Sequence, residues 1–316
     1  MSPQAVILDT DPGIDDALAI LLALASPEIE LLAVTVTGGN CPLDQGVRNA
    51  LSVLELARAD VPVVPGVAVP LLRPPLTAPE THGASGLGRA QLPPPRRLPA
   101  DDHAVDYLVR TLMQAVRPVT LVAVAPLTNV ALAVRREPRI VERLREVIVM
   151  GGAFDVPGNT TPLAEFNIYV DPHAAAIVLH SGLPLTIIPW DITAQVLLGP
   201  AHIEQLLRAP GPIPRFIADA TSFYIDFHHD YFGYAGCAIN DPCALALAFR
   251  PELARVESVF VDVETDSPRT LGKTFADVHR TLGRQPNARL VRTFDREAFL
   301  DLFLTRMIAL ARRCAG

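Results

Sequence analysis

The sequence predicts an α/β protein in which an open, mostly parallel central sheet is flanked by helices, in a single domain that spans residues 1–316. Three observations support this fold class. Short runs of branched apolar residues alternate with longer helix-forming segments along the chain. The apolar runs end in small or polar residues, as expected when one rim of a parallel sheet carries a ligand site. No repeat period and no linker divides the chain, although 316 residues would suffice for two average domains.

The first unit of this pattern is the most unusual stretch of the sequence. Val6–Leu8 is typical of a buried parallel strand, Pro12-Gly13 predicts a turn, and residues 17–25 are rich in helix-forming residues. Between the strand and the helix, four aspartates fall within eight positions: Asp9, Asp11, Asp15 and Asp16. Converging carboxylates repel one another unless a proton or a hard cation joins them, so this stretch predicts a calcium or magnesium site.

The residues alone leave two alternatives for these aspartates. Some of them can simply cap the helix while the others lie in a solvated turn. The stretch Asp9-Thr10-Asp11 is also similar to the signature of aspartyl-nucleophile phosphatases, but that chemistry needs a cation for the phosphate, and the only lysine is the distant Lys273. An EF-hand is excluded, because a loop that began at Asp9 would have Ile14 in place of its glycine and Ile20 in place of its glutamate.

The next segments continue the alternation of strands and helices. Strands are expected at residues 29–37 and 61–64, with a helix over residues 43–59 between them. The following residues, 68–100, are crowded with prolines and interrupted by glycines. Because a loop of this length in a compact domain is usually functional or mobile, we interpret residues 68–100 as an active-site flap.

The later strands are expected at the same rim of the sheet. A helix over residues 102–116 precedes a strand at 120–124, and two further strands are expected at 147–150 and 185–189. A helix is also expected to begin near Asp171.

Three groups of polar and aromatic residues accompany these later strands. Glu165 and Asn167 could hold vicinal hydroxyls through complementary acceptors and donors, or Glu165 could be a solvated loop acid. Asp241 begins a helix, either as a ligand or as a simple N-cap. The third group suits either packing or a base-stacking pocket, and consists of Tyr224, His228, Tyr231 and Tyr234.

Composition excludes several classes of function. The net charge of −7 and the lack of a basic stripe argue against a nucleic-acid partner. The four cysteines have neither the spacing of metal ligands nor the density of a disulfide scaffold, so we expect reduced thiols. The longest apolar run near the start, residues 17–25, is too short to span a bilayer and follows no basic segment, which favours a cytoplasmic protein without a membrane partner.

Taken together, these residues resemble the inosine-uridine preferring nucleoside hydrolase family. The opening stretch, residues 9–17, looks like the aspartate signature of that family. The resemblance continues in order through Gly39-Asn40, His82-Gly83, Pro126–Asn129, Met150–Gly152, Ala164–Asn167 and Asp241–Cys243. It implies the open α/β fold, a tightly held calcium ion, and hydrolysis of the N-glycosidic bond of ribonucleosides to ribose and a free purine or pyrimidine base. It also implies a role in nucleoside catabolism and a homodimer or homotetramer.

The resemblance assigns roles to individual residues. Four match the calcium ligands of the family, three through carboxylates and the last through its main-chain carbonyl: Asp11, Asp16, Asp241 and Val124. The residues that match the ribose pocket are Asp15, Asn40, Met150, Asn159, Glu165, Phe166 and Asn167. The ion is expected to bind the 2′- and 3′-hydroxyls and one water, from which Asp11 removes a proton as the water attacks the anomeric carbon.

The sequence departs from the family pattern directly before the last calcium ligand. Many members have a histidine there to protonate the departing base, whereas this chain has Asn240. Because an amide cannot act as a general acid, His82 and His228 become the candidate acids, and Asn240 is expected to hydrogen-bond an edge of the base. Both histidines could instead serve packing, and Trp190 is expected in the core. A non-catalytic calcium-dependent nucleoside- or sugar-binding protein would use the same ligands and stays an alternative.

Overall fold

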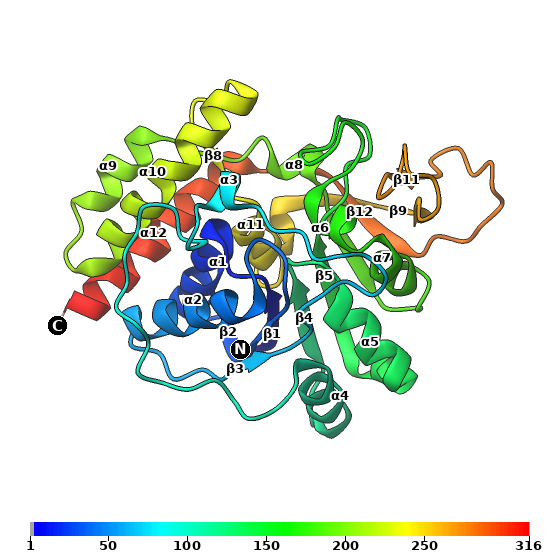
Figure 1. The fold of residues 1–316 in the computed structure, drawn as a ribbon, viewed down its shortest axis with the longest axis horizontal. Coiled ribbons are helices and arrows are strands. Elements are labelled where there is room, and N and C mark those ends of the chain that lie inside the picture. Colours follow the sequence, from blue (N-terminus) through cyan, green and yellow to red (C-terminus); the bar gives the residue numbers. More distant parts are fainter. Residues whose placement is uncertain (1–2, 316) are drawn as a thin grey trace.

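One eight-stranded sheet forms the centre of the molecule, with the strand order β3-β2-β1-β4-β5-β6-β12-β9 (Figure 1). The computed structural model describes residues 3–315. Neighbouring strands of this sheet run parallel except for β12 and β9 at one edge. The strands are β1 (Gln4–Thr10), β2 (Ile29–Val36), β3 (Val63–Pro65), β4 (Val119–Ala123), β5 (Leu144–Met150), β6 (Leu185–Ile188), β9 (Ala254–Val259) and β12 (Ala288–Phe294). The predicted fold class is therefore confirmed.

The helices and the minor strands complete the list of elements. The helices are α1 (Ile14–Ala25), α2 (Leu43–Leu56), α3 (Pro79–His82), α4 (Ala104–Gln114), α5 (Thr128–Arg136), α6 (Phe166–Val170), α7 (Pro172–Leu179), α8 (Trp190–Thr193), α9 (Pro200–Leu207), α10 (Pro212–Phe232), α11 (Asn240–Leu247) and α12 (Arg296–Ala315). Two antiparallel pairs lie outside the main sheet, β7 (Leu197–Leu198) with β8 (Cys237–Ala238) and β10 (Val261–Val263) with β11 (Thr274–Ala276). Among the described residues, no helix has both the length and the apolar character that crossing a bilayer requires.

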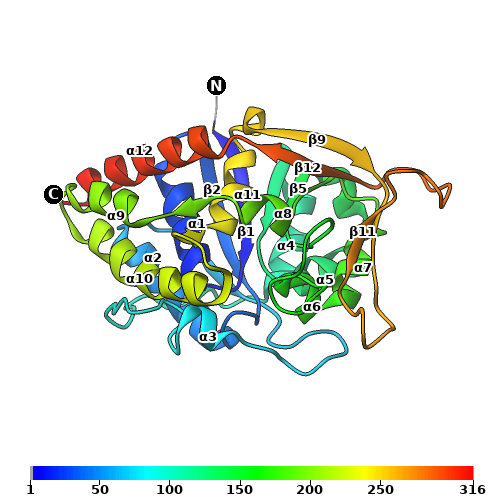
Figure 2. The same cartoon turned by 90° about the horizontal axis from the view of Figure 1, so that it is seen from above.

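Two apolar cores lie on the two faces of the sheet. In β1, Val6 and Leu8 belong to the core beneath α1, α2, α10 and α12, whereas Ala5 and Ile7 belong to the core beneath α4, α5 and α7. This alternation follows from the two-residue period of a strand, whose successive side chains point to opposite faces. Figure 2 shows the same division, with the two sets of helices on either side of the sheet. A parallel sheet covered on both faces explains the continuous apolar runs in the sequence.

Helix α1 is buried on all sides, which is unusual for a helix that begins with two acids. Apart from Leu24, every residue from Ile14 to Ala25 is buried, because α2, α10, α11 and α12 all pack around this helix. A helix that is apolar all round is stable only inside a large core. Its first turn consequently carries Asp15 and Asp16 deep into the protein, at the carboxyl end of β1.

The predicted elements recur in the structure with shifts at their ends. The helix expected over residues 43–59 ends at Leu56, shortly before Arg58 adopts a left-handed backbone with φ of 55°. The helix expected near Asp171 begins at Pro172, and the Asp171 carboxylate caps it by accepting a hydrogen bond from the amide of Ala174. Strand β9, at the edge of the sheet, and its neighbour β12 are missing from the predicted strands, because charged residues interrupt their apolar pattern.

The proline-rich segment 68–100 crosses the surface near the carboxyl ends of the strands, with α3 as its single helical turn (Figure 1). Hydrogen bonds tie it to the body at several points. The amide of Leu71 donates to Asp171, and the amide of Ala78 donates to the carbonyl of Asn40. Further along, the carbonyl of Ser85 accepts from Asn49, the amides of Arg96 and Arg97 donate to Glu55, and the amide of Ala100 donates to Val63. Whether this segment moves as a flap stays a prediction.

Candidate active site

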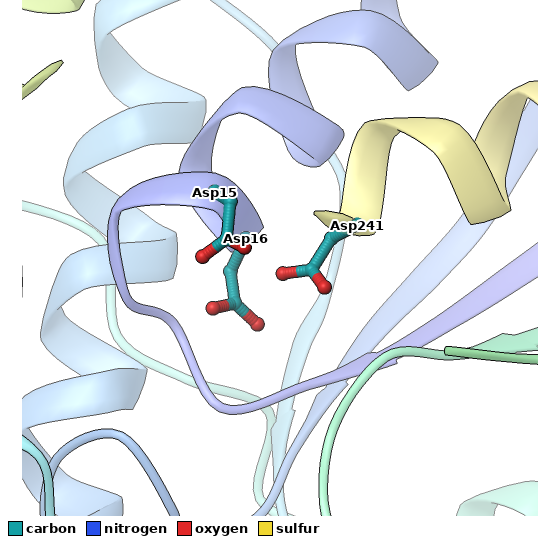
Figure 3. A group of neighbouring side chains, drawn as sticks. All are labelled: Asp15, Asp16 and Asp241. Carbon is teal, nitrogen blue, oxygen red and sulfur yellow. The ribbon is translucent and has the colours of Figure 1, made fainter. Parts of the chain in front are cut away.

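The candidate site lies at the carboxyl ends of β1 and β4, where the strand order reverses. The chain passes from β1 to β2 on one side, while β4 pairs with the other edge of β1. In open α/β sheets such a reversal opens a crevice in which ligands bind. Asp15 and Asp16 reach this crevice from the first turn of α1, and Asp241 reaches it from the first turn of α11 (Figure 3). Carboxylate oxygens of these three residues lie within 4.8 Å of one another.

Burial of these carboxylates makes their negative charge costly. Asp241 is only 3% exposed, and burial raises its pKa well above the usual range, helped by the neighbouring carboxylates of Asp15 and Asp16. Burial likewise raises the pKa of Asp15 and that of Asp16. A cation that joined the three groups would replace this repulsion with attraction. The alternative in which Asp241 merely caps its helix is wrong, since Ile239 holds the N-cap position and no side chain caps α11.

The turn between β1 and α1 fixes the Asp16 carboxylate. Its four donors are the Thr10 hydroxyl, the amides of Asp11 and Gly13, and the Asn40 side chain. The Gly13 and Asn40 bonds are both 2.9 Å long. A Cβ atom at Gly13 would lie 2.6 Å from Nδ1 of His82, so this close approach requires glycine. Asp16 is therefore held in one orientation by its own turn.

Asp11 and Asp9 have different surroundings. Oδ2 of Asp11 accepts a 2.6 Å hydrogen bond from the backbone amide of Asn40, whereas Oδ1 of Asp11 is buried and has no hydrogen-bond partner among residues 3–315. Burial, followed by the charge of Asp16, raises the pKa of Asp11 well above the usual range. Asp9 lies deeper and accepts hydrogen bonds from Thr35 and Asn129, while burial raises its pKa to about 6. Asp11 thus keeps an unpaired acceptor beside the cluster, and Asp9 links β1 to β2 and α5.

Glu165 and Asn167 lie close to this acidic cluster. The alternative of a solvated loop acid is wrong for Glu165, which is 1% exposed and accepts hydrogen bonds from the amides of Gly152, Asn167 and Ile168. Burial raises the pKa of this carboxyl group. Nδ2 of Asn167 donates to the main-chain carbonyls of Val124 and Met150, at 3.0 and 3.2 Å. The carbonyl expected as a metal ligand and the side chains expected at the ribose therefore form one connected group.

A pocket that is partly open to solvent lies above these residues. The residues expected from the sequence that line it are Asp15, Asn40, His82, Val124, Met150, Asn159, Glu165, Phe166, Asn167, Tyr224, His228, Asn240 and Asp241. Asp11 and Asp16 are not part of the lining and lie fully buried. The cavity thus combines a hydroxyl-binding group, an acidic cluster and a wall with two histidines.

A sequence model of one family, described as inosine-uridine preferring nucleoside hydrolase, matches residues 6–301 of this chain. The chain belongs to the nucleoside hydrolase family. This result confirms the resemblance and the class of enzyme, an N-glycosyl hydrolase that acts on ribonucleosides.

Individual nucleoside hydrolases are similar to the chain over nearly its whole length. The pyrimidine-specific ribonucleoside hydrolase RihA of Salmonella arizonae is 41% identical over 304 residues, which cover 96% of this chain and 97% of that protein. The solved structure of a purine-preferring ribonucleoside hydrolase from Gardnerella vaginalis superposes with a TM-score of 0.93 at 34% identity, covering 98% of this chain and 100% of the other. A plant nucleoside hydrolase, PpNRh1, gives a TM-score of 0.90 at 34% identity, with 96% and 99% covered.

The surroundings of Lys273 give the phosphatase alternative no support in this nucleoside hydrolase. The ammonium group donates hydrogen bonds to the main-chain carbonyls of Ala153 and Phe154, at 2.7 and 2.9 Å, and so already has partners. A nucleophilic aspartate would need such a cation beside its phosphate.

The residues of the acidic cluster fit a hard divalent cation. All the side chains that could bind it are carboxylates, which is the donor type that calcium and magnesium prefer. The unpaired Oδ1 of Asp11 is a buried acceptor whose missing partner a cation would supply. The carboxylates that lie within 4.8 Å of one another are those of Asp15, Asp16 and Asp241. Asp15, expected at the ribose, thus belongs to this group, and Asp11, expected as a metal ligand, does not.

Aromatic residues that sequence reasoning missed form much of the cavity wall. Phe227 and Phe232 of α10 line the cavity, together with Trp190, which also packs in a small core with Ala153 and Ala238 as expected. Tyr231, by contrast, is 71% exposed and lies outside the lining. The spacing of aromatic residues in α10 indicated an aromatic face, but only the orientation of this helix decides which of them reach the cavity.

Proposed function

We propose that this nucleoside hydrolase requires calcium and cleaves the N-glycosidic bond of ribonucleosides, releasing ribose and a free purine or pyrimidine base. One observation carries the proposal. A buried group of carboxylates lies under a cavity whose lower wall carries acceptors and donors suited to vicinal hydroxyls. A purely structural acidic cluster would have no reason to lie beneath such a cavity.

The proposed calcium ligands are the carboxylates of Asp11, Asp16 and Asp241 and the main-chain carbonyl of Val124, with Asp15 close enough to take part. When bound, a hard divalent cation lowers the pKa of water and attracts hydroxyl oxygens. The donor set favours calcium over softer metals, because it contains only oxygen atoms.

Different residues of the chain bind the ribose and accept the proton of the attacking water. Glu165, fixed by three backbone amides, accepts hydrogen bonds from ribose hydroxyls, while the Asn167 amide and the Asp15 carboxylate hold the remaining ones. The Asp11 carboxylate, which lies beside the acidic cluster, accepts the proton of the attacking water. Positive charge that grows on the ribose ring is stabilised by the surrounding carboxylates.

The segment 68–100 contributes His82 to the cavity wall, from the end of α3. We propose that this part of the segment covers the nucleoside during the reaction, which would exclude water from the breaking bond. Its anchors at Ala78 and Ser85 limit such movement to the short stretch between them.

The test is a direct assay of sugar release. Purified protein with calcium should release reducing sugar from inosine or uridine, and Asp11→Asn should lower the rate by about 10²–10⁴-fold. A nucleoside-binding protein without activity would show a nucleoside-dependent rise in Tm but no sugar, and a phosphatase would release phosphate from p-nitrophenyl phosphate instead. Either of these results would replace the proposal.

A further inference from the structure

The two histidines of the cavity wall are held by backbone groups of opposite kind. Nδ1 of His82 meets a backbone amide, whereas Nδ1 of His228 meets a backbone carbonyl. We propose that this contrast gives the base subsite a fixed polarity, in which His82 donates a hydrogen bond to the departing base and His228, together with Asn240, accepts from an N–H group of the base. This inference rests on the proposed function and deepens it, since it assigns the residues that recognise and release the base.

His82 is a neutral donor because of its contact with α1. The amide of Ile14, the first residue of that helix, lies 3.1 Å from Nδ1 of His82. A backbone amide can only donate, so Nδ1 holds a lone pair and the neutral ring carries its hydrogen on Nε2. A proton on Nδ1 would break this bond and place a positive charge at the positive end of the helix dipole. Burial also lowers the pKa of His82 to about 4.

His228 has the opposite tautomer. Its Nδ1 lies 2.9 Å from the carbonyl oxygen of Tyr224, one turn earlier in α10. A carbonyl can only accept, so Nδ1 carries the hydrogen and Nε2 of the neutral ring holds a lone pair. The rings of Tyr224 and Phe227 pack edge-on against the imidazole, with centroids at 4.4 and 5.5 Å, which fixes its orientation. His228 therefore presents an acceptor to the cavity that it lines.

Asn240 adds a second acceptor. Its Nδ2 donates to Oδ2 of Asp15 at 2.8 Å, and this contact decides the orientation of the amide, since a carboxylate can only accept. Oδ1 of Asn240 is consequently turned away from Asp15, and it is buried without a hydrogen-bond partner among the described residues. An unpaired buried acceptor in a cavity wall costs free energy unless a ligand supplies a donor.

A donor and two acceptors that line the same pocket match a base edge that has an N–H group next to a carbonyl or ring nitrogen. The hypoxanthine of inosine and the uracil of uridine have such an edge, whereas the base of purine riboside has no N–H donor. In the reaction, the bond between C1′ and the base nitrogen breaks and its electron pair stays on the base. Water supplies the oxygen to C1′ and passes its proton to Asp11. The hydrogen bond from His82 stabilises the charge on the base, which takes its proton from solvent.

The experiment compares three substrates with the calcium-loaded enzyme: inosine, purine riboside and p-nitrophenyl riboside. Hydrolysis of p-nitrophenyl riboside tests the proposed function by itself, because its leaving group needs neither histidine. For the wild type, we expect kcat/KM for inosine to exceed that for purine riboside by at least about tenfold, since purine riboside leaves the buried acceptors without a donor. Equal values would overturn the inference even if every variant failed to fold.

Two variants separate the roles of the histidines. His228→Phe keeps an aromatic ring but removes the acceptor, so it should lower kcat/KM for inosine about ten times more than that for purine riboside. His229→Phe is the matched control, because His229 is the exposed neighbour on α10 and should leave the ratio unchanged. If His228→Phe lowers kcat/KM equally for inosine and purine riboside but leaves that for p-nitrophenyl riboside unchanged, His228 is a proton donor and the inference is wrong.

The side chain of glutamine distinguishes a neutral donor from an acid at His82. Its amide can donate a hydrogen bond but cannot release a proton. We expect His82→Ala to lower kcat for inosine by about tenfold or more, and His82→Gln to restore a substantial part of it. A His82→Gln enzyme as slow as His82→Ala, together with normal binding of inosine, would show that a titrating imidazole is required and would overturn the assignment.

Discussion

The floor and the wall of the cavity are built in different ways. The floor consists of carboxylates in the turn between β1 and α1 and in the first turns of α1 and α11. The backbone amides of Asp11 and Gly13 hold Asp16, and that of Asn40 holds Asp11. The wall consists of histidines and aromatic rings from α3 and α10, which belong to segments far apart in the sequence. The main chain therefore fixes Asp11 and Asp16 of the floor, whereas Asp15 is held by two side chains of the wall, Tyr224 and Asn240. We expect selectivity for the sugar to be strict and selectivity for the base to be adjustable.

Removing the metal should have the largest effect on activity and stability, because the proposed calcium ion binds the carboxylates of the floor. A strong chelator should abolish hydrolysis and lower Tm, and added calcium should restore both, since a ligand of the native state stabilises it by about 4 kcal/mol at 1,000 times its Kd. Activity and thermal unfolding of the same sample provide the measurement. Asp241→Asn should lose the calcium effect on Tm, while the control Asp230→Asn, at an exposed position of α10, should keep it. Full activity in a verified metal-free sample would end the calcium proposal.

The sugar should matter more than the base. Loss of the 2′-hydroxyl removes one ligand of the floor and leaves buried polar groups unpaired, and sites built for a hydroxyl reject analogues without it by about 10⁴–10⁵-fold. We expect this loss in kcat/KM for 2′-deoxyinosine relative to inosine, and for 2′-deoxyuridine relative to uridine. Ratios within about tenfold, roughly 1.4 kcal/mol, would mean that the hydroxyl is not bound by the floor.

The wall should contribute to the pH dependence of stability with a definite sign. Burial lowers the pKa of His228 to about 4. Above the unfolded value of about 6.5, this ring is neutral in both states. As the pH falls from 6.5 towards 4, His228 becomes protonated in the unfolded chain but stays neutral in the native state, so the free energy of unfolding decreases. His228→Phe should remove this contribution, so the free energy of unfolding should fall by about 2 kcal/mol less between neutral pH and pH 5 than it does in the wild type.

Urea unfolding of the wild type and His228→Phe at pH 5 and pH 7.5 measures this difference. The same pair of experiments with His229→Phe is the control, since the side chain of His229 is exposed on the same helix. An identical pH dependence for wild type and His228→Phe would mean that the pKa of His228 is the same in the native and the unfolded protein.

The smallest effect is expected just outside the wall. Tyr231 stacks on Phe227, with ring centroids 4.9 Å apart, yet it is 71% exposed. Tyr231→Ala should change the free energy of unfolding by no more than about 0.5–1 kcal/mol and leave the ratio of inosine to uridine hydrolysis unaltered. A changed ratio would mean that the base subsite extends beyond the buried rings to Tyr231.

The same division explains how much could be predicted from the sequence. The positions of the floor carboxylates could be predicted from short stretches of sequence. The strand, turn and first helical turn that contain Asp11 and Asp16 are contiguous, and the carboxyl ends of neighbouring parallel strands lie at the same edge of the sheet. Side-chain orientation decides that Asp15, and not Asp11, belongs to the closest group of carboxylates. For Asp11, this orientation is set by the hydrogen bond from the backbone amide of Asn40. The contributions of Phe227 and Phe232 depend on how α10 packs, and no local pattern contains that information.

The hydrogen bond between the Ile14 amide and His82 has a consequence for how the cavity opens. Between its anchors at Ala78 and Ser85, the proline-rich segment is joined to α1 by this bond. Any opening of this stretch must first release the Ile14 amide, which is otherwise shielded at the start of a buried helix. Hydrogen–deuterium exchange at this single amide would therefore report how often the cavity opens, and a bound nucleoside that keeps the stretch in place should slow the exchange.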